Sequence, residues 1–381
     1  MFEKWYLEEL INKTIRDIWK LTDYFLLKLI SNILDNAEIT PLLKSGTTVN
    51  NIIQKKNYPA NVYASLKWLL DRLKLDGFVS MRLDNNVEFY TLSNKTMGYD
   101  LDAIKSMAEK ASPESMAAFN MLELMANNYP DYLSGKKTGV DIIFSPENID
   151  ITNEYYGNNL FYNVHNIAGA KIVNWDISTR ENPQILEIGG GLGGGTKQFV
   201  IQRLKENAPL NSFNYCFTDV ANKMLRSTKK ALSTLTTEDL SAFTFKKLDF
   251  NKNLSEQGYA ENSYDVIWGV NAAHVSFDMR FSLNELFKTL KNGGSFIISE
   301  TVRPIGNLMI QQEFVLNTLD DYWNVKLDEK IRPRHGFMDW SDWVRALKEI
   351  GFINVETIPD MNVLQKEYDN CYVAVVRGIK P

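Results

Sequence analysis

The sequence predicts an α/β fold built around a parallel sheet. The first observation is an apolar run of strand type at residues 185–188, which contains Glu187 and precedes six glycines within residues 189–195. A helical segment follows at residues 197–204, and strand, glycine turn and helix in that order open a nucleotide-binding α/β unit. The second observation is a series of three further strand-like runs that each end in a polar residue. Four polar strand ends form a crevice of the kind in which open parallel sheets bind ligands.

The glycines have a specific use in this turn. Gly189, Gly191 and Gly193 let the backbone turn sharply and approach a ligand more closely than any Cβ would permit. A glycine repeat on its own also fits a flexible loop, so the three strand ends that follow decide between a binding site and a loop.

The later strand ends supply groups that suit an adenosine. The first places the carboxylate of Asp219 where it could accept hydrogen bonds from both ribose hydroxyls. Asp249 and Phe250 follow the next run and could bind the adenine amino group and cover the adenine face. The last run brings Asn271, a further candidate cofactor-binding residue, and then His274 to the same edge of the sheet. These runs are residues 213–219, 243–248 and 264–271.

The acid that precedes the glycines indicates which ligand is bound. In a dinucleotide site the loop faces a pyrophosphate, and the carboxylate of Glu187 would repel that anion. S-adenosylmethionine carries no phosphate, and its ammonium and sulfonium groups are attracted to a carboxylate. The series from Glu187 to Asn271 therefore resembles a class I S-adenosylmethionine-dependent methyltransferase, which implies S-adenosylmethionine as the cofactor.

The rest of the C-terminal half continues the same fold. The strand after Asn271 ends at Glu300, the helix beyond it is expected to cap the pocket, and the last two strands are expected to form an antiparallel edge. We expect helices at residues 280–290, 307–324 and 339–350, a turn at 291–294 and strands at 295–299, 352–357 and 371–376. The prediction is a Rossmann-like seven-stranded methyltransferase sheet.

The N-terminal region is predicted to be mainly helical. Residues 2–33 place apolar side chains at three- and four-residue spacing over an unusually wide helix face. Part of such a face is expected at a homodimer or interdomain contact. Packing within the core of the same chain is the alternative.

Residues 47–92 read as two helices and a hairpin, which is the pattern of a winged helix. The elements are helices at 47–53 and 60–75 and strands at 78–83 and 87–92. A DNA-binding role would use Lys67, Arg72 and Lys74 on the second helix. We favour a dimerisation or lid domain, because this module has that role in small-molecule methyltransferases and the chain is acidic.

The segment between these regions is predicted to be helical and then aromatic. Residues 98–127 read as helix, with Ser112 as the N-cap of a second piece that ends at Tyr129-Pro130. Residues 154–166 are dense in aromatic and amide groups and are expected to form a substrate-facing wall. We therefore divide the chain into a winged-helix-like domain at 1–95, a helical linker and substrate-facing segment at 96–170, and a methyltransferase domain at 171–381.

The composition of the 381 residues excludes several classes of protein. An apolar fraction of 44% and a charged fraction of 23% are those of a globular protein. The net charge of −5 argues against a nucleic-acid binder. Cys216 and Cys371 are expected to be reduced core residues, which suggests a cytoplasmic protein. Residues 24–34, the most apolar early segment, contain Lys28 and are too short to span a bilayer. No metal site is expected.

The sequence also indicates a catalytic base. Methyl transfer to a hydroxyl or an acidic carbon needs a general base with a pKa near the working pH. Of the three histidines, only His274 lies just past a strand end that also belongs to the cofactor site. Glu300 stands at the end of the next strand, where it could orient the imidazole and stabilise its protonated form. A histidine that merely satisfies backbone groups in a loop is the alternative.

Five motifs together resemble the C-methyltransferase domains of polyketide synthases. They are 186–196, 217–219, 248–250, 271–274 and 298–300, within a similarity that covers roughly residues 129–305. The resemblance implies a catalytic dyad of His274 and Glu300, with Tyr162 assisting at the acceptor and Asn271 as the asparagine three residues before the histidine. It implies as substrate an acyl compound that is either a small molecule or bound to an acyl carrier protein.

The sequence departs from that family outside the shared region. No carrier, ketosynthase or reductase sequence is present in these residues, so we expect a free-standing enzyme. The leading hypothesis is methylation of an activated carbon in natural-product biosynthesis. O- or N-methylation of a small aromatic or amino-acid-like metabolite is the second hypothesis, because a winged-helix-like N-terminus resembles O-methyltransferases of small phenolic metabolites. A DNA-binding regulator with a vestigial methyltransferase fold is the third.

Overall fold

The computed structural model describes residues 2–304, 306 and 308–381. The chain forms two compact units. The first consists of Met1–Asn12, Phe161–Asn307 and Asn324–Pro381, and the second of Lys13–Leu160 and Leu308–Trp323. The three-way division predicted from the sequence stays a prediction.

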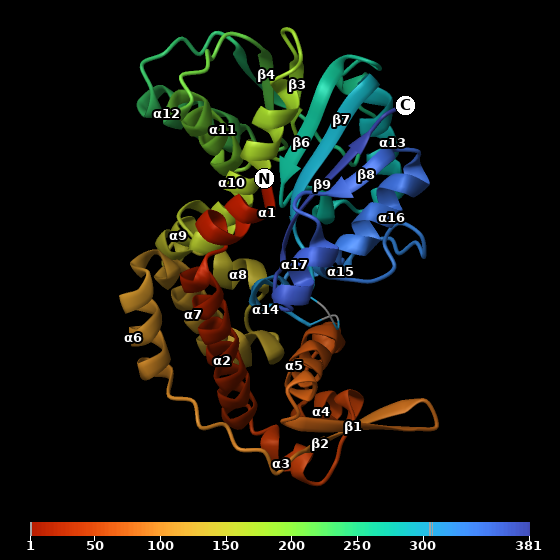
Figure 1. Cartoon of the computed structure of the whole chain (residues 1–381). Coiled ribbons are helices and arrows are strands. Elements are labelled where there is room, and N and C mark those ends of the chain that lie inside the picture. Colours follow the sequence, from red (N-terminus) through yellow and green to blue (C-terminus); the bar gives the residue numbers. More distant parts are fainter. Residues whose placement is uncertain (1, 305, 307) are drawn as a thin grey trace. The chain divides into compact units, whose positions relative to one another are not determined.

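The first unit contains a seven-stranded sheet in the order β5-β4-β3-β6-β7-β9-β8 (Figure 1). The strands are β3 (Gln184–Glu187), β4 (Asn214–Asp219), β5 (Phe243–Lys247), β6 (Tyr264–Val270), β7 (Leu290–Thr301), β8 (Ile353–Thr357) and β9 (Val373–Ile379). The first five in the sheet run parallel, and β9 pairs antiparallel with both β7 and β8. The predicted seven strands and antiparallel edge are confirmed. Because the strand order reverses between β3 and β6, the ligand crevice of such a sheet is expected at the ends of these two strands.

Helices cover both faces of this sheet (Figure 1). On one face α10 (Leu160–Ile177) and α11 (Gly194–Lys205) pack so closely that a Cβ on Gly169 or Gly195 would lie 3.4 or 2.9 Å from the ring of Trp268. On the other face Phe352, which follows α16 (Trp340–Ile350), contacts Phe287 of α13 (Met279–Thr289) and stacks on Phe296 of β7, with ring centroids 4.9 and 5.6 Å apart. The unit also contains α1 (Phe2–Trp5), η1 (Tyr6–Leu10), α12 (Asn222–Leu235), η4 (Ser255–Gln257), η5 (Ala273–Val275) and α17 (Met361–Glu367).

The alternation of side chains along β7 separates two neighbouring residues at its end. Phe296 points to the face covered by α13 and α16, whereas Ser299 points to α10, since a Cβ on Gly169 would lie 3.0 Å from Ser299 Cβ. Successive side chains of a strand point to opposite faces. Glu300 therefore lies on the α13 and α16 face, and Thr301 lies on the α10 face.

The second unit is mainly helical. Its elements are α2 (Lys13–Asn36), α3 (Thr40–Lys44), α4 (Val49–Lys56), η2 (Ala60–Val62), α5 (Tyr63–Leu75), β1 (Val79–Asp84), β2 (Val87–Leu92), α6 (Leu101–Ala111), η3 (Pro113–Ser115), α7 (Met116–Leu133), α8 (Gly139–Ile143), α9 (Ile149–Gly157), α14 (Gln311–Leu316) and α15 (Asp320–Trp323). The predicted order of helix, helix and hairpin appears as α4, α5 and β1–β2, and Thr48 caps α4 by accepting a bond from Asn51 N at 3.0 Å.

The wide apolar face of α2 packs against α5, α6 and α7 within this unit. Phe25 of α2 contacts Phe119 of α7 with ring centroids 4.9 Å apart, and both side chains are fully buried. These contacts favour the core-packing alternative for this face, and pairing of two chains stays a prediction. None of the described helices is both long enough and apolar enough to cross a membrane.

Three local predictions need correction. Helix α7 does not end at Tyr129-Pro130 but runs through Pro130 to Leu133, because a proline in the last turn removes one hydrogen bond without ending the helix. The expected turn at 291–294 belongs to β7, since Gly293 N and Gly294 O pair with the backbone of Lys380. The helix expected at 307–324 is two short helices, α14 and α15, and its residue 307 lies outside the described residues.

Candidate active site

The glycine turn connects β3 to α11 and is held open on one side. Gly189, Gly191 and Gly193 all have positive φ, of 56°, 55° and 74°. Residues other than glycine adopt such φ values only at a cost in free energy. A Cβ on Gly189 would lie 2.8 Å from Ala272 Cβ, so the turn packs directly against the loop after β6. A Cβ on Gly191 would meet no atom within 4 Å. A ligand can therefore approach the backbone at Gly191.

Glu187, the acid before the glycines, has protein partners. Its carboxylate is almost fully buried and accepts hydrogen bonds from Thr196 of α11 and, at 2.7 Å, from the Tyr215 hydroxyl of β4. Burial raises the pKa of Glu187 to about 7, against the lowering effect of these two bonds. The side chain thus ties the first turn of α11 to the sheet beneath the glycine turn. Its predicted contact with a cationic ligand stays a prediction.

Asp219 lies at the end of β4, as expected, and its two oxygens are both positioned by backbone groups. Oδ2 accepts from Gly191 N at 3.0 Å, and Oδ1 accepts from Ala221 N at 2.8 Å. A carboxylate oxygen can accept two hydrogen bonds, so each oxygen retains capacity for a ligand hydroxyl. The bond to Gly191 brings this acceptor beside the open side of the turn.

Asp249 and Phe250 lie beyond the end of β5. Asp249 Oδ1 accepts from Asn251 N at 3.1 Å, and Oδ2 pairs with Lys252 at 3.0 Å. The buried Phe250 ring is 3.8 Å from the position of a Cβ on Gly189. Phe250 is therefore brought next to the glycine turn, as the sequence predicted for a residue that covers a ligand ring.

His274 and Glu300 are brought together as the sequence predicted. His274 Nδ1 lies 2.7 Å from Glu300 Oε2, and the imidazole is 13% exposed while Glu300 is fully buried. Glu300 Oε1 accepts from the backbone N–H groups of Ala272 and Ala273 at 3.1 and 2.8 Å. Because the carboxylate is an acceptor in every one of these bonds, Nδ1 carries the proton of a neutral imidazole. Nε2 is then the ring atom able to take a proton.

Two further contacts hold His274 from outside the sheet. The ring packs edge-on against Phe337 with centroids 4.9 Å apart. Arg332 Nη1 donates to the backbone oxygens of His274 and Ser276 at 2.7 and 3.0 Å. The imidazole is thus fixed by the carboxylate at Nδ1 and by the ring of Phe337, and Arg332 fixes its backbone.

Asn271 lies in the left-handed region with φ of 47° and faces β7. Its Oδ1 accepts from Thr301 N at 2.7 Å and from Thr301 Oγ1 at 2.9 Å. Its Nδ2 is buried and has no hydrogen-bond partner among the described residues. A buried donor without an acceptor is costly, so this nitrogen suits a ligand oxygen.

His165 of α10 is a residue of this region that the sequence reasoning did not single out. It is fully buried, and its Nε2 lies 3.2 Å from Thr301 Oγ1. One turn later on the same helix is Gly169, which marks the close approach of α10 to the sheet, and this spacing is the signal that could have placed His165 near the strand ends. Tyr162 lies one turn before His165 and is half-buried.

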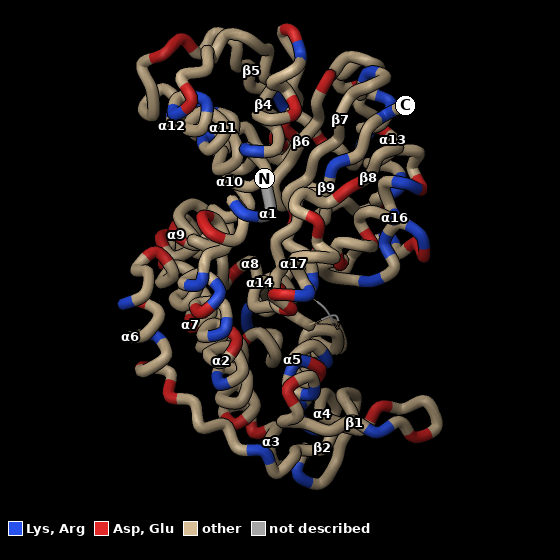
Figure 2. The backbone as a smooth tube through the Cα atoms, in the orientation of Figure 1, with Lys and Arg blue, Asp and Glu red and all other residues tan. Residues whose placement is uncertain are grey.

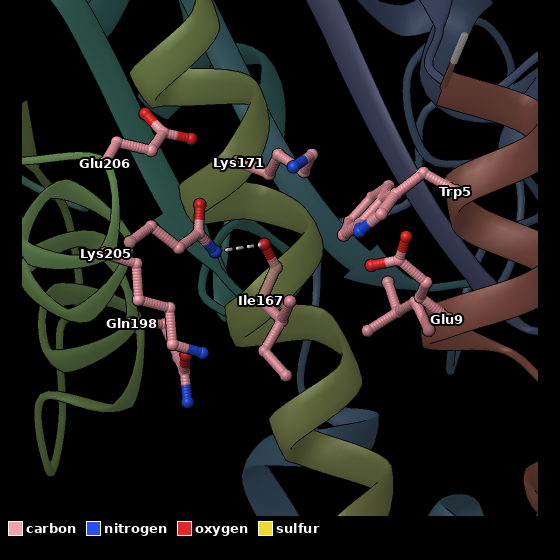
Figure 3. A pocket seen from close by; sticks show the side chains of 9 residues that line it. Trp5, Glu9, Ile167, Lys171, Gln198, Lys205 and Glu206 are labelled. Carbon is pink, nitrogen blue, oxygen red and sulfur yellow. Dashed lines mark hydrogen bonds between the residues drawn. The ribbon is translucent and has the colours of Figure 1, made fainter.

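A separate pocket of about 360 Å³ lies away from the predicted site residues (Figure 3). It is lined by residues of α1, η1, α10 and α11 and by Glu206, and Lys171 lies over the ring of Trp5 at 4.7 Å from its centroid. No residue of the candidate site lines it. Among the described residues, no group of three or more His, Cys, Asp or Glu side chains could hold a metal ion.

Acidic and basic residues are interspersed along α5 and the β1–β2 hairpin (Figure 2). Lys67 pairs with Glu88 and with Asp71, and Lys74 pairs with Asp71 at 2.9 Å. Arg72 is 1% exposed and pairs with Asp76 and Asp23. The three cations that a DNA-binding role would use are therefore neutralised by neighbouring carboxylates.

Comparison with known proteins shows that part of this chain is similar to methyltransferase domains. Residues 186–296 match the family model of the methyltransferase domain. The highly reducing polyketide synthase 2 of Gibberella zeae is 22% identical over 331 residues, which cover 85% of this chain but only 12% of that synthase. The chain thus spans a small part of the length of this curated relative.

Two solved structures share the fold of the whole chain. The CurJ carbon methyltransferase is 18% identical with a TM-score of 0.78, covering 98% of this chain and 94% of that one. The trans-methyltransferase CalH, solved with S-adenosylhomocysteine, is 18% identical with a TM-score of 0.60, covering 97% and 90%.

Proposed function

We propose that this chain, which carries a methyltransferase domain and shares the fold of carbon methyltransferases, methylates an acidic carbon between two carbonyl groups. The observation that carries the proposal is the pair His274 and Glu300, with Nδ1 and Oε2 2.7 Å apart at the end of β7. A neutral imidazole held in this way presents Nε2 as a base. The acceptor class is a β-ketoacyl thioester or a similar activated acyl compound.

His274 Nε2 takes the proton from the acidic carbon, and the electron pair of the C–H bond becomes an enolate. The imidazolium that forms is stabilised by the carboxylate of Glu300. Bound S-adenosylmethionine supplies an electrophilic methyl group on a sulfonium. The enolate carbon would take this methyl group, and the electron pair of the broken C–S bond would stay on sulfur. The chain's contribution to this displacement is orientation.

The residues at the ends of β3, β4 and β5 suit the cofactor. Asp219 would accept the ribose hydroxyls, the backbone at Gly191 gives close access, and Phe250 would cover the adenine. Asp249 would bind the adenine amino group. Glu187 would act on the cofactor's cationic end through the turn that it anchors.

Tyr162 would donate a hydrogen bond to the enolate oxygen, where negative charge develops. It lies on the same helix as His165 and Asn166, and the side chain of Asn166 lies within 3.0 Å of the position of a Cβ on Gly194 in the glycine turn. The acyl substrate would arrive as a small molecule or on an acyl carrier protein.

The test is a single-turnover reaction of the protein with labelled S-adenosylmethionine and a β-ketoacyl thioester, followed by NMR to locate the added methyl group. A methyl group on carbon supports the proposal. A methyl group on oxygen or nitrogen supports the second hypothesis, O- or N-methylation. Neutralisation of Lys67, Arg72 and Lys74 by carboxylates speaks against the DNA-binding hypothesis.

A further inference from the structure

Three side chains on the α10 face of β7 form a hydrogen-bonded chain that leads to the candidate active site. His165 Nε2 lies 3.2 Å from Thr301 Oγ1, and Thr301 Oγ1 lies 2.9 Å from Asn271 Oδ1. His165 and Thr301 are 0% and 1% exposed. The chain connects helix α10 to the loop after β6, more than a hundred residues apart in the sequence.

The direction of each hydrogen bond follows from the one group that can only donate. The backbone N–H of Thr301 lies 2.7 Å from the Asn271 side-chain amide. Because an N–H group can only donate, the amide must place its oxygen, Oδ1, toward Thr301. The same oxygen also accepts a hydrogen bond from the Thr301 hydroxyl, and this bond uses the hydroxyl's single proton. Thr301 Oγ1 can then only accept from His165, so Nε2 is the ring nitrogen that carries the proton.

This assignment agrees with the surroundings of His165. Burial, and after it the electrostatic effect of His274, together lower the pKa of the imidazole to about 3. A neutral imidazole has one N–H, and the bond to Thr301 uses it. Nδ1 is buried without a partner among the described residues, which is the lone-pair atom expected for this tautomer.

Since the oxygen of Asn271 is fixed toward Thr301, Nδ2 is fixed on the opposite side of the amide. It is buried and has no acceptor among the described residues. Asn271 lies three residues before His274, and its turn is joined to β7 by the bond from Asn271 N to Ser299 O at 2.9 Å. An N–H donor held in place before the reaction lowers the barrier when it points to an atom on which negative charge develops.

We propose that His165 and Thr301 are positioning residues that fix the Asn271 amide, so that Nδ2 donates a hydrogen bond to the enolate oxygen of the acceptor. This inference rests on the proposed function for the identity of the acceptor. In it the two histidines have separate tasks. His274 receives the proton, and His165 orients the amide that donates a hydrogen bond to the oxygen on which negative charge develops.

The first experiment measures single-turnover methyl transfer in Thr301→Val, which keeps the shape of the side chain and removes the hydroxyl. We expect a rate about 3- to 10-fold lower, the effect of one neutral hydrogen bond, and unchanged affinity for S-adenosylhomocysteine by calorimetry. Thr301→Ser should restore the rate. Thr289→Val is the matched control, because Thr289 is also 1% exposed and its hydroxyl bonds only to Glu285 O within α13.

A double-mutant cycle separates positioning from a general structural effect. Asn271→Ala should lower the rate by about 10²-fold, the effect of removing one oxyanion donor, and adding Thr301→Val to it should cost no more. His165→Phe should slow the reaction like Thr301→Val and likewise have no effect in the Asn271→Ala background. If Thr301→Val slows the reaction equally with and without Asn271, the inference is overturned.

A second readout does not depend on the acceptor. In protein with ¹⁵N-labelled histidine, NMR should show His165 as the neutral Nε2–H tautomer, with shifted signals in Thr301→Val and unshifted signals in Thr289→Val. A proton on Nδ1, or a spectrum unaffected by Thr301→Val, would refute the hydrogen-bonded chain. If the wild type methylates no carbon acid while these NMR results hold, the proposed function and the role of Nδ2 at the enolate fail, and the chain from His165 to Asn271 stands.

Discussion

The two halves of the crevice use their buried carboxylates in opposite ways. At the ends of β3 and β4, Glu187 accepts from Thr196 and Tyr215, and Asp219 accepts from Gly191 and Ala221. These bonds hold the shape of a turn. At the end of β7, Glu300 holds the loop with one oxygen and a reactive side chain, His274, with the other.

Buried carboxylates therefore have two roles. At the ends of β3 and β4 they hold the shape of a binding surface, and at the end of β7 a carboxylate orients the side chain that accepts a proton. Substitutions in the first half should therefore change cofactor affinity, and substitutions in the second half should change the rate of methyl transfer. Each prediction below can confirm or contradict that separation.

The largest effect is expected for His274→Ala. Removing the general base should lower the single-turnover rate by about 10²–10⁴-fold, with little change in the affinity for S-adenosylhomocysteine, because the imidazole contacts Glu300 and Phe337 and not the carboxylates at the ends of β3 and β4. Rapid-quench kinetics and calorimetry measure the two quantities. An unchanged rate would remove His274 as the base, and a loss confined to affinity would contradict the separation.

Glu300→Gln should have the next largest effect, on the order of 10²-fold in rate, because the substitution reverses the tautomer of His274. The N–H groups of Ala272 and Ala273 donate to Oε1, so the glutamine must place its carbonyl oxygen at that position. Its NH₂ group then faces His274 Nδ1 and forces the ring proton onto Nε2, the atom that should accept. A ¹⁵N-histidine spectrum of this variant should show the Nε2–H form, and the Nδ1–H form would contradict this explanation.

The parts of the site that the sequence predicted are those formed by short segments. The glycine turn and the acids at Asp219 and Asp249 could be placed because each follows a strand directly, and the ends of parallel strands meet at one edge. His274 follows β6, and Glu300 lies near the end of the neighbouring strand β7, so the same rule brings them together. The fold was predictable for the same reason, since alternating strands and helices leave few topologies.

The contacts that the sequence did not predict depend on which face of the sheet a side chain reaches. The contact of Glu187 with a cationic ligand stays a prediction, and its hydrogen bonds to Thr196 and Tyr215, which the sequence did not indicate, are set by the register between β3 and β4 and by the packing of α11. His165 reaches Thr301 only because α10 approaches the sheet at Gly169. Neither the strand register nor this close approach of α10 can be predicted from the local pattern of apolar and polar residues.

Asp219→Ala should act on affinity. Losing charge-assisted hydrogen bonds to the ribose should cost about 1.5–3 kcal/mol, or about tenfold to a hundredfold in the Kd of S-adenosylhomocysteine, with a smaller change in the rate at saturating cofactor. Calorimetry and single turnovers measure both. Binding of NAD in preference to S-adenosylhomocysteine by the wild type would reject the cofactor assignment, and an effect on rate alone would contradict the separation of the two halves.

The smallest effect is expected in stability, at the buried His165. The pKa of His165 is about 3 in the folded chain and about 6.5 in an unfolded one, so below pH 6.5 the unfolded chain binds a proton that the folded chain does not. The free energy of unfolding contributed by this group therefore falls as pH falls, by about 2 kcal/mol between pH 7.5 and pH 5. Glu187 has the opposite effect on stability, because its pKa is raised to about 7 and the folded chain binds the extra proton.

The measurement is therefore the free energy of unfolding in urea, compared between the wild type and His165→Phe at the two pH values. The wild type should lose about 2 kcal/mol more than the variant on going to pH 5, and equal pH dependence of the two proteins would show that His165 is not held neutral in the folded chain.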